Sequence, residues 1–329
     1  MDHYCTLFDS FYLSRGLAMY RSLQKQSCDF HLYIFPFDEQ AREMLDQLAL
    51  NHVTLVPLSE FESEELREAK KTRTKGEYCW TCTPYIISYC ISRFNLHACT
   101  YIDADLYFFS DPRPLILEMK QKSVLITEHR YTAEYDKRKR KGIYCVQFIT
   151  FKNDPNGLEA LNWWRDRCLE WCYDKVEDGK FGDQKYLDDW PERFSGVHVL
   201  EHLGGGVAPW NAQQYTFKKE GERVEVSDSK EARDVIFYHF HYLKFYANQM
   251  IDLGIYPISD SLLRNIYDPY LIGILEAEDI LLSRFAFNRI TQKYFYKNTM
   301  FTLIHRYVRK LLGVYNLYTL TDRKNGVLH

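Results

Sequence analysis

The sequence predicts an α/β protein with a central, mostly parallel sheet of the nucleotide-binding type, flanked by helices. In the first part of the chain, buried-strand patterns at 4–8, 31–35 and 53–58 alternate with helical periodicity at 13–23 and 39–50. A strand–helix–strand alternation of this kind builds parallel sheets. The composition agrees with a large globular domain, since 46% of the 329 residues are hydrophobic and 26% are charged.

The net charge and several missing sequence signals disfavour some classes of protein. A net charge of −3 gives no sign of a nucleic-acid partner. The N-terminal residues lack the basic and apolar regions of a signal peptide, and no apolar run reaches the roughly 18 residues that span a bilayer. We therefore expect a cytoplasmic protein with reduced thiols. The absence of G-x-G-x-x-G after the first strand argues against a nicotinamide dinucleotide fold.

The end of the first strand is a candidate ligand site. In open parallel sheets the ligand lies beyond the carboxyl ends of the strands. The residues expected at this position are Thr6, Phe8, Asp9 and Tyr12. Asp9 has an alternative role, because an Asp directly before a helical pattern often caps that helix.

The segment 101–111, YIDADLYFFSD, places two acids in an apolar and aromatic run. On an extended segment Asp103 and Asp105 lie on the same side, with Ala104 on the other. Two buried carboxylates repel each other, so a divalent cation with room for phosphate oxygens is expected between them. The alternative is a strand end entering a turn, with Asp103 as a cap and Asp105 solvated.

This segment resembles the Asp-x-Asp motif of GT-A nucleotide-sugar glycosyltransferases, most closely family eight, the glycogenin and bacterial lipopolysaccharide sugar transferase type. The resemblance covers roughly residues 3 to 245. It implies a GT-A fold, Mn²⁺ or Mg²⁺ held by Asp103 and Asp105 against the donor's diphosphate, a UDP-sugar donor, and transfer with retention of anomeric configuration.

Two further segments carry the resemblance. Gly182-Asp183-Gln184 matches the family's Asp-Gln pair, in which the acid binds sugar hydroxyls and the amide lies beside the reacting carbon. In the segment 235–246, His239 matches the family's remaining metal ligand and Lys244 the lysine that holds the diphosphate. The spacing to Lys244 is shorter than usual in the family, so His241 remains an alternative ligand.

The resemblance also implies contacts to the nucleotide and the sugars. Asp9 and Tyr12 become candidates for base and ribose binding, and Tyr78, with Arg73 and Lys75 nearby, for the nucleotide. The candidates for the sugar and acceptor sites are His129, Arg130, Gln147, Trp210 and Asn211. At the family's Asn-x-Gly segment this chain has Cys145 and Gln147, which leaves the identity of the donor sugar open.

The remaining elements follow from local patterns. Residues 64–76 are charged and helical in character, and Pro84 suits the first turn of the next helix. The basic stretch within 131–142 is expected to be a surface loop that is solvated or closes over a diphosphate. Further strands are expected at 101–111, 124–130, 142–151 and 235–246, and a further helix at 156–173.

We expect a transferase domain over residues 1–260 and a helical, basic and aromatic extension over 261–329. In the extension Phe301, Ile304, Val308 and Leu311 recur at helical spacing, and basic residues such as Arg309 lie off that stripe. Such a helix can lie on an anionic membrane surface, which would place the protein peripherally on the inner face of the membrane. Equally, it can pack on the domain with its basic face in water.

Together these observations predict metal-dependent transfer of a sugar from a nucleoside diphosphate sugar to a hydroxyl of a glycan or lipid-linked glycan. Two alternatives remain open from the sequence. One is a non-catalytic nucleotide- or glycan-binding module, or membrane scaffold, derived from a transferase. The other is a sugar nucleotidyltransferase, although the segment after the first strand is a poor match to its Gly-rich loop.

Overall fold

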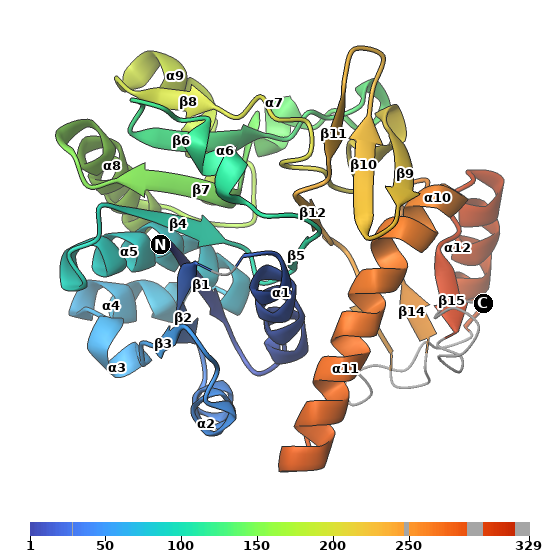
Figure 1. The fold of residues 1–329 in the computed structure, drawn as a ribbon, viewed down its shortest axis with the longest axis horizontal. Helices are drawn as coiled ribbons and strands as arrows, with labels where there is room; N and C mark the ends of the chain where they lie inside the picture. The colour runs from blue at the N-terminus through green and yellow to red at the C-terminus, as the bar shows by residue number, and fades with distance from the viewer. Residues whose placement is uncertain (28, 247–249, 288–298, 320–329) are drawn as a thin grey trace.

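The computed structural model describes residues 1–27, 29–246, 250–287 and 299–319, and is built around a seven-stranded sheet (Figure 1). The strands run in the order β3-β2-β1-β4-β7-β6-β8. Their bounds are Asp2–Phe8 (β1), Phe30–Pro36 (β2), Val53–Leu55 (β3), Ala98–Ile102 (β4), Val124–Glu128 (β6), Tyr144–Lys152 (β7) and Val197–Val199 (β8). Only β7 runs antiparallel to its neighbours β4 and β6. The predicted α/β fold with a mostly parallel sheet is confirmed.

Helices cover both faces of this sheet and create two cores. One face carries α4 (Glu64–Thr72), α5 (Lys75–Arg93) and α8 (Pro155–Glu170), and the other carries α1 (Leu13–Gln26), α2 (Glu39–Leu48) and α11 (Asp268–Phe285). Residues of β1 alternate between them, with Cys5 in the first core and Tyr4 in the second. Burial on both faces explains why the strands are nearly continuous apolar runs.

A second region lies beside the main sheet and holds a third core (Figure 1). Its strands are β5 (Leu106–Phe108), β9 (Thr216–Glu220), β10 (Arg223–Ser227), β11 (Ala232–Asp234), β12 (Phe237–His239), β13 (Lys244–Phe245), β14 (Met250–Asp252) and β15 (Leu317–Thr319). The other α-helices of the described chain are α3 (Leu58–Phe61), α6 (Arg113–Leu117), α7 (Arg138–Lys141), α9 (Trp190–Arg193), α10 (Asp260–Leu262) and α12 (Met300–Leu311). Short 3₁₀ segments are at Ala133–Tyr135, Gln184–Asp189 and Ala212–Gln214, and a π-helical turn is at Leu263–Tyr267. The long helix α11 packs along α1 and so joins the two regions.

The segment 101–111 is not one strand, which corrects the expectation from its periodicity. Strand β4 ends at Ile102 and β5 begins at Leu106, with a tight turn in which the Leu106 N–H donates to the Asp103 carbonyl (3.2 Å). The chain turns here because it leaves the main sheet and pairs β5 with β12 instead. Asp103 and Asp105 are therefore presented by a turn at the edge of the sheet.

The segment 235–246 is also interrupted. Strand β12 ends at His239, the chain turns through Tyr242 at φ 71°, and β13 begins at Lys244. The expected position of Pro84 in a first helical turn was wrong as well. Helix α5 starts at Lys75 because Thr74 and Glu77 form a capping box, so Pro84 lies in the helix interior.

Helix α12 has its apolar face in solvent, which corrects the expected position of Arg309 on a solvated face. Phe301 is 78% exposed and Leu311 is 68% exposed, whereas Arg309 is 4% exposed. The Arg309 guanidinium makes two 2.8 Å hydrogen bonds to the Asp252 carboxylate, one from each terminal nitrogen. A buried Arg held by a bidentate carboxylate therefore anchors the helix to the rest of the chain.

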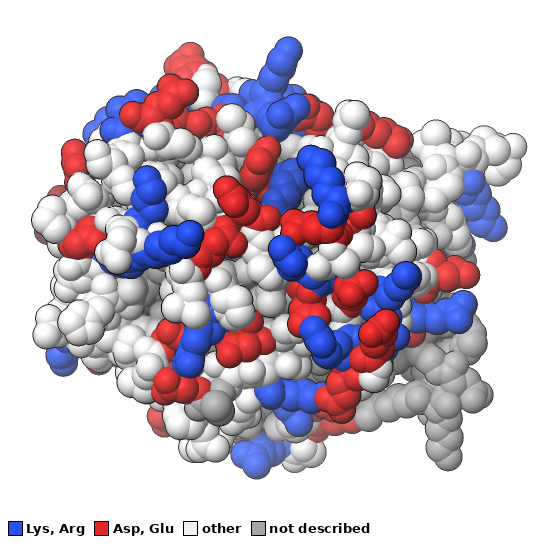
Figure 2. Space-filling model, turned by 45° about the horizontal axis from the view of Figure 1, so that its top comes forward, with Lys and Arg blue, Asp and Glu red and all other residues white. Residues whose placement is uncertain are grey.

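The surface shows no large area of one charge on the face drawn in Figure 2, where acidic and basic side chains are intermixed. Within the described ranges, no helix combines the length and the apolar character needed to cross a membrane.

Candidate functional site

A cavity of about 650 Å³ opens where the loops after β1 and β4 meet the turn after β12. Its volume lies within the roughly 300–1,000 Å³ of small-molecule sites. The sequence-predicted residues that line it are Phe8, Asp9, Tyr12, Asp103, Asp105, His129, Asp183, Gln184, Trp210 and His239. These residues come from segments far apart in the chain, and the fold brings them together at one edge of the sheet.

Three of these side chains form a compact group of possible metal ligands. The Nε2 atom of His239 lies 3.2 Å from an Asp105 carboxylate oxygen and 3.7 Å from one of Asp103. One ligand atom of each of the three residues lies within 4.8 Å of the others. His241 also lines the cavity but is not in this group.

Backbone pairing sets the positions of the three ligands. His239 is opposite Leu106 in the β5–β12 ladder, and the Phe240 N–H donates to the Asp105 carbonyl (3.0 Å). The Asp103 N–H donates to the Gln147 carbonyl of β7 (3.0 Å). The site is thus assembled from strand ends whose register is fixed by hydrogen bonds.

The protonation of the group follows from burial and mutual attraction. Burial, with the nearby charge of Asp105, raises the pKa of Asp103 to about 6. Burial alone would also raise the pKa of Asp105, but the adjacent His239 lowers it below its usual range. Burial would lower the pKa of His239, but the Asp105 carboxylate outweighs it and raises that pKa well above its ordinary value. Without a metal, an imidazolium therefore neutralises part of the carboxylate charge.

The residues fit Mn²⁺ or Mg²⁺. Two carboxylates supply the oxygen ligands that hard divalent cations prefer, and a neutral imidazole adds a nitrogen. Three protein ligands leave coordination positions for the oxygens of a phosphate. In the described chain, the ligand atoms of one other group lie close enough together to hold a metal ion. This group is Cys5, Cys90 and Cys99, which are fully buried in the core.

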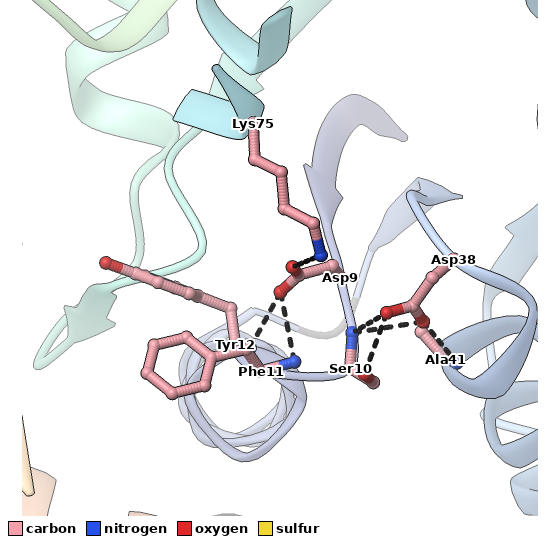
Figure 3. A network of polar contacts seen from close by, with 7 residues as sticks. All are labelled: Asp9, Ser10, Phe11, Tyr12, Asp38, Ala41 and Lys75. Atoms are coloured by element: carbon pink, nitrogen blue, oxygen red, sulfur yellow. Dashed lines mark hydrogen bonds and ion pairs between the residues drawn. The ribbon is translucent and has the colours of Figure 1, made fainter. Parts of the chain in front are cut away.

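The loop after β1 lines the cavity and is held by a network of polar contacts (Figure 3). The Asp9 carboxylate accepts hydrogen bonds from the N–H groups of Phe11 (3.0 Å) and Tyr12 (3.2 Å) and lies 3.4 Å from the Lys75 ammonium. The Asp38 carboxylate accepts from the main-chain N–H and the hydroxyl of Ser10. Asp9 thus stabilises the start of α1, and its carboxylate still faces the cavity beside Lys75.

Asp183 and Gln184 also line the cavity. Gly182 precedes them with φ +51°, a left-handed conformation, and a side chain there would meet the Trp80 ring at 3.3 Å. Burial, with the charge of Asp103, raises the pKa of Asp183 well above its usual range. The Gln184 amide donates to the Lys141 carbonyl (2.6 Å), which leaves its oxygen as an acceptor.

Other predicted residues do not line the cavity: Thr6, Tyr78, Arg130, Gln147, Asn211 and Lys244. Their polar groups mostly have other partners. The Tyr78 hydroxyl donates to Glu62 (2.8 Å), and the Arg130 guanidinium donates to carbonyls of residues 200, 202 and 203. The Asn211 amide makes three hydrogen bonds to backbone groups. Lys244 is exposed.

Several lining residues were not found from the sequence: Trp80, Tyr101, Phe181, Tyr242 and Tyr256. Three more, Tyr131, Lys137 and Lys141, lie in the segment 131–142, for which closure over a diphosphate was one of two expectations. Tyr101 had a usable signal, because it lies two residues before Asp103, near the end of the strand that leads into the acidic turn, and its hydroxyl donates to that carboxylate (2.8 Å). Lys137 and Lys141 lie one helical turn apart, so both can face the cavity while Lys139 between them is exposed.

The chain has informative relatives. No model of a known protein family matches it. It is 32% identical to YfnD, an uncharacterized protein of Bacillus subtilis (strain 168), over 86% of this chain and 92% of that protein. It is 35% identical to YfnF, another uncharacterized protein of that organism, over 72% of this chain and 80% of that protein.

Among solved structures, the chain is similar to the galactosyltransferase LgtC in complex with donor and acceptor sugar analogs. The TM-score is 0.53 at 9% sequence identity, over 83% of this chain and 95% of that chain. This similarity shows the shared fold, and it confirms the GT-A fold expected from the sequence.

Metal affinity should depend on pH, because a bound cation displaces the protons of His239 and Asp103, whose pKa values are both raised. We expect Mn²⁺ affinity to fall by about tenfold or more per pH unit below about pH 6. Calorimetric titration between about pH 7.5 and about pH 5.5 measures this. A His239→Asn variant should bind more weakly and with a shallower pH dependence. Affinity that stays constant over this range would contradict the assignment.

Proposed function

Because the chain belongs to the family of Bacillus subtilis YfnD and YfnF and has the GT-A fold, we propose that it is a metal-dependent glycosyltransferase. It transfers a hexose from a UDP-hexose to a hydroxyl of a glycan or lipid-linked glycan, with retention of anomeric configuration. The observation that carries the proposal is the group formed by Asp103, Asp105 and His239 in the wall of a cavity of about 650 Å³.

The donor's diphosphate lies against this group. Asp103, Asp105 and His239 hold Mn²⁺ or Mg²⁺, which when bound neutralises the diphosphate and stabilises the departing nucleoside diphosphate. Lys137 and Lys141 add positive charge to the same cavity. Within the described ranges neither lysine has a carboxylate within 4 Å, so both ammonium groups are available to a phosphate.

The nucleoside and the sugar contact different groups of lining residues. The nucleoside lies at the end of β1, where Asp9 accepts hydrogen bonds and the Tyr12 ring offers an aromatic face. The sugar lies against Asp183 and Gln184, whose oxygens accept hydrogen bonds from hydroxyl groups. Trp210, 5% exposed, forms the wall on the acceptor side.

The acceptor is reached at a membrane surface, where the protein binds peripherally on the cytoplasmic side. The exposed apolar side chains of α12 support this, because they would be buried among lipid headgroups and acyl chains. Lys310 is exposed on the same helix, and the described helix contains no acidic residue. A helix of this composition favours an anionic surface.

The reaction class is tested by donor hydrolysis with a panel of UDP-, GDP-, dTDP- and CMP-sugars and Mn²⁺, with nucleotide release as the readout. We expect release from a UDP-hexose that needs the metal. It should fall by about 100-fold or more in Asp105→Ala, because a lost ligand removes several kcal/mol of charge stabilisation. An absence of both turnover and nucleotide binding with every donor would leave only a non-catalytic module.

The basic segment 137–141 offers two test variants and one matched control. Lys137→Ala and Lys141→Ala should each raise the KM for the donor by about tenfold, the size of one charge-assisted hydrogen bond. Lys139→Ala, which removes an exposed neighbour, should leave the KM unchanged. The KM of each variant is measured by steady-state kinetics with varied donor concentration. Equal KM values in all three variants would exclude contact between these lysines and the diphosphate.

Membrane binding is tested by sedimentation with anionic and with neutral vesicles. The protein should sediment with anionic vesicles, and Phe301→Ser with Ile304→Ser should weaken this by about tenfold or more, since two exposed apolar side chains are lost. Ile272→Ser on α11, a position that is 45% exposed, is the control and should not change binding. The proposal is contradicted if Ile272→Ser also loses vesicle binding. It is equally contradicted if the wild-type protein sediments with neither anionic nor neutral vesicles.

A further inference from the structure

We propose that Gln147 is a positioning residue of the metal site, which holds His239 in the tautomer that binds the cation and holds the Asp103 turn in place. The inference rests on the proposed metal-dependent function, and it assigns a role to a residue that does not line the cavity. Gln147 is on β7 and is completely buried.

The first contact is to the imidazole. The Nδ1 atom of His239 lies 2.6 Å from the Gln147 amide oxygen. An amide oxygen only accepts hydrogen bonds, so Nδ1 carries the proton and donates it. A neutral His239 then has its lone pair on Nε2, the atom that faces Asp103 and Asp105. This is the tautomer that a cation between the three side chains requires.

The second contact is to the other side of the metal site. The Gln147 carbonyl accepts from the Asp103 N–H (3.0 Å), directly beyond the last β4–β7 register pair, Ile102 with Phe148. One residue therefore contacts the main chain of one acidic ligand and the side chain of the histidine. Because Gln147 is on an interior strand of the sheet, its main chain and side chain give both contacts a common support.

Packing alone does not explain a glutamine at this position. Its Nε2 atom is buried and has no hydrogen-bond partner among the described residues. A buried amide that leaves a donor unpaired destabilises the fold relative to an apolar side chain of similar shape. Gly206, at φ +87°, lies beside it: a Cβ there would be 3.3 Å from Nε2 and 2.5 Å from the Thr127 methyl. The hydrogen bond to His239 is the interaction that a Met or Leu could not supply.

The test compares Mn²⁺ binding with folding. Gln147→Met keeps the side-chain volume but removes the oxygen that accepts from His239. Gln147→Asn keeps an amide, but its side chain is one methylene shorter and no longer reaches His239. Both should lower Mn²⁺ affinity by about 10- to 100-fold, the usual effect of losing the partner of a metal-binding histidine. Gln147→Glu keeps an acceptor and should stay within about threefold of the wild type. Mn²⁺ affinity is measured by electron paramagnetic resonance of the free ion.

The matched control is Thr150→Val on the same strand. It removes a buried hydrogen bond to Thr100 (2.8 Å) that does not involve the metal site, and it should leave Mn²⁺ affinity unchanged. Thermal unfolding without metal shows that each variant is folded. Histidine ¹⁵N spectra of the metal-free protein at high pH should show His239 protonated on Nδ1 in the wild type and a mixture of tautomers in Gln147→Met.

The outcomes separate the two proposals. If Gln147→Met and Gln147→Asn bind Mn²⁺ as tightly as the wild type, or if Thr150→Val loses as much affinity, the role of Gln147 is overturned and the transferase proposal stands. If Mn²⁺ binding depends on Gln147 as expected but the wild type neither binds nor hydrolyses any donor, the transferase proposal fails and the role of Gln147 is supported. If the wild type binds no Mn²⁺, both are overturned.

Discussion

The site depends on the ion pair between His239 and the two carboxylates of the turn after β4. Asp103 and Asp105 would repel each other in a cavity wall, and the nearby imidazolium offsets that repulsion in the absence of a metal. A bound cation would supply the positive charge instead. The ion pair is possible because β5 leaves the main sheet directly after the turn and pairs with β12. The same pairing therefore positions the histidine and one of the acids, so their separation is set by the backbone rather than by flexible side chains.

The sequence predicted the parts of the structure that depend on local pattern. The alternating strands and helices of the first region and the helix α12 follow from periodicity, which is a property of neighbouring residues. The group of Asp103, Asp105 and His239 was also anticipated, from residue type and from a family resemblance. The break after Ile102 was anticipated only as an alternative and the break after His239 was missed, because each strand ends where it changes its pairing partner, and that partner is distant in the sequence. The burial of Arg309 was missed for the same reason, since Asp252 lies 57 residues away.

Polar residues near the cavity were harder to assign than charged ones. Arg130 and Asn211 follow or precede apolar segments at the cavity's edge, as sugar-binding residues would, yet their side chains satisfy buried backbone carbonyls. Gln147 likewise contacts His239 and not the cavity. A loop that folds into the interior must find partners for its main-chain groups, and the same residue types serve that need and ligand binding. Only the three-dimensional contacts distinguish the two uses.

The contacts around Gly254 bear on how much of the chain makes a working enzyme. Asn316, after α12, donates to the carbonyls of Gly254 (3.0 Å) and Tyr256 (2.6 Å), and β15 extends the small sheet through β14. Tyr256 in turn lines the cavity, although no described residue beyond it does. A fragment that stopped before α12 would keep every described lining residue but would lose the Asn316 amide that these carbonyls bond to. The described chain from α12 to β15 thus supports the wall of the cavity without lining it.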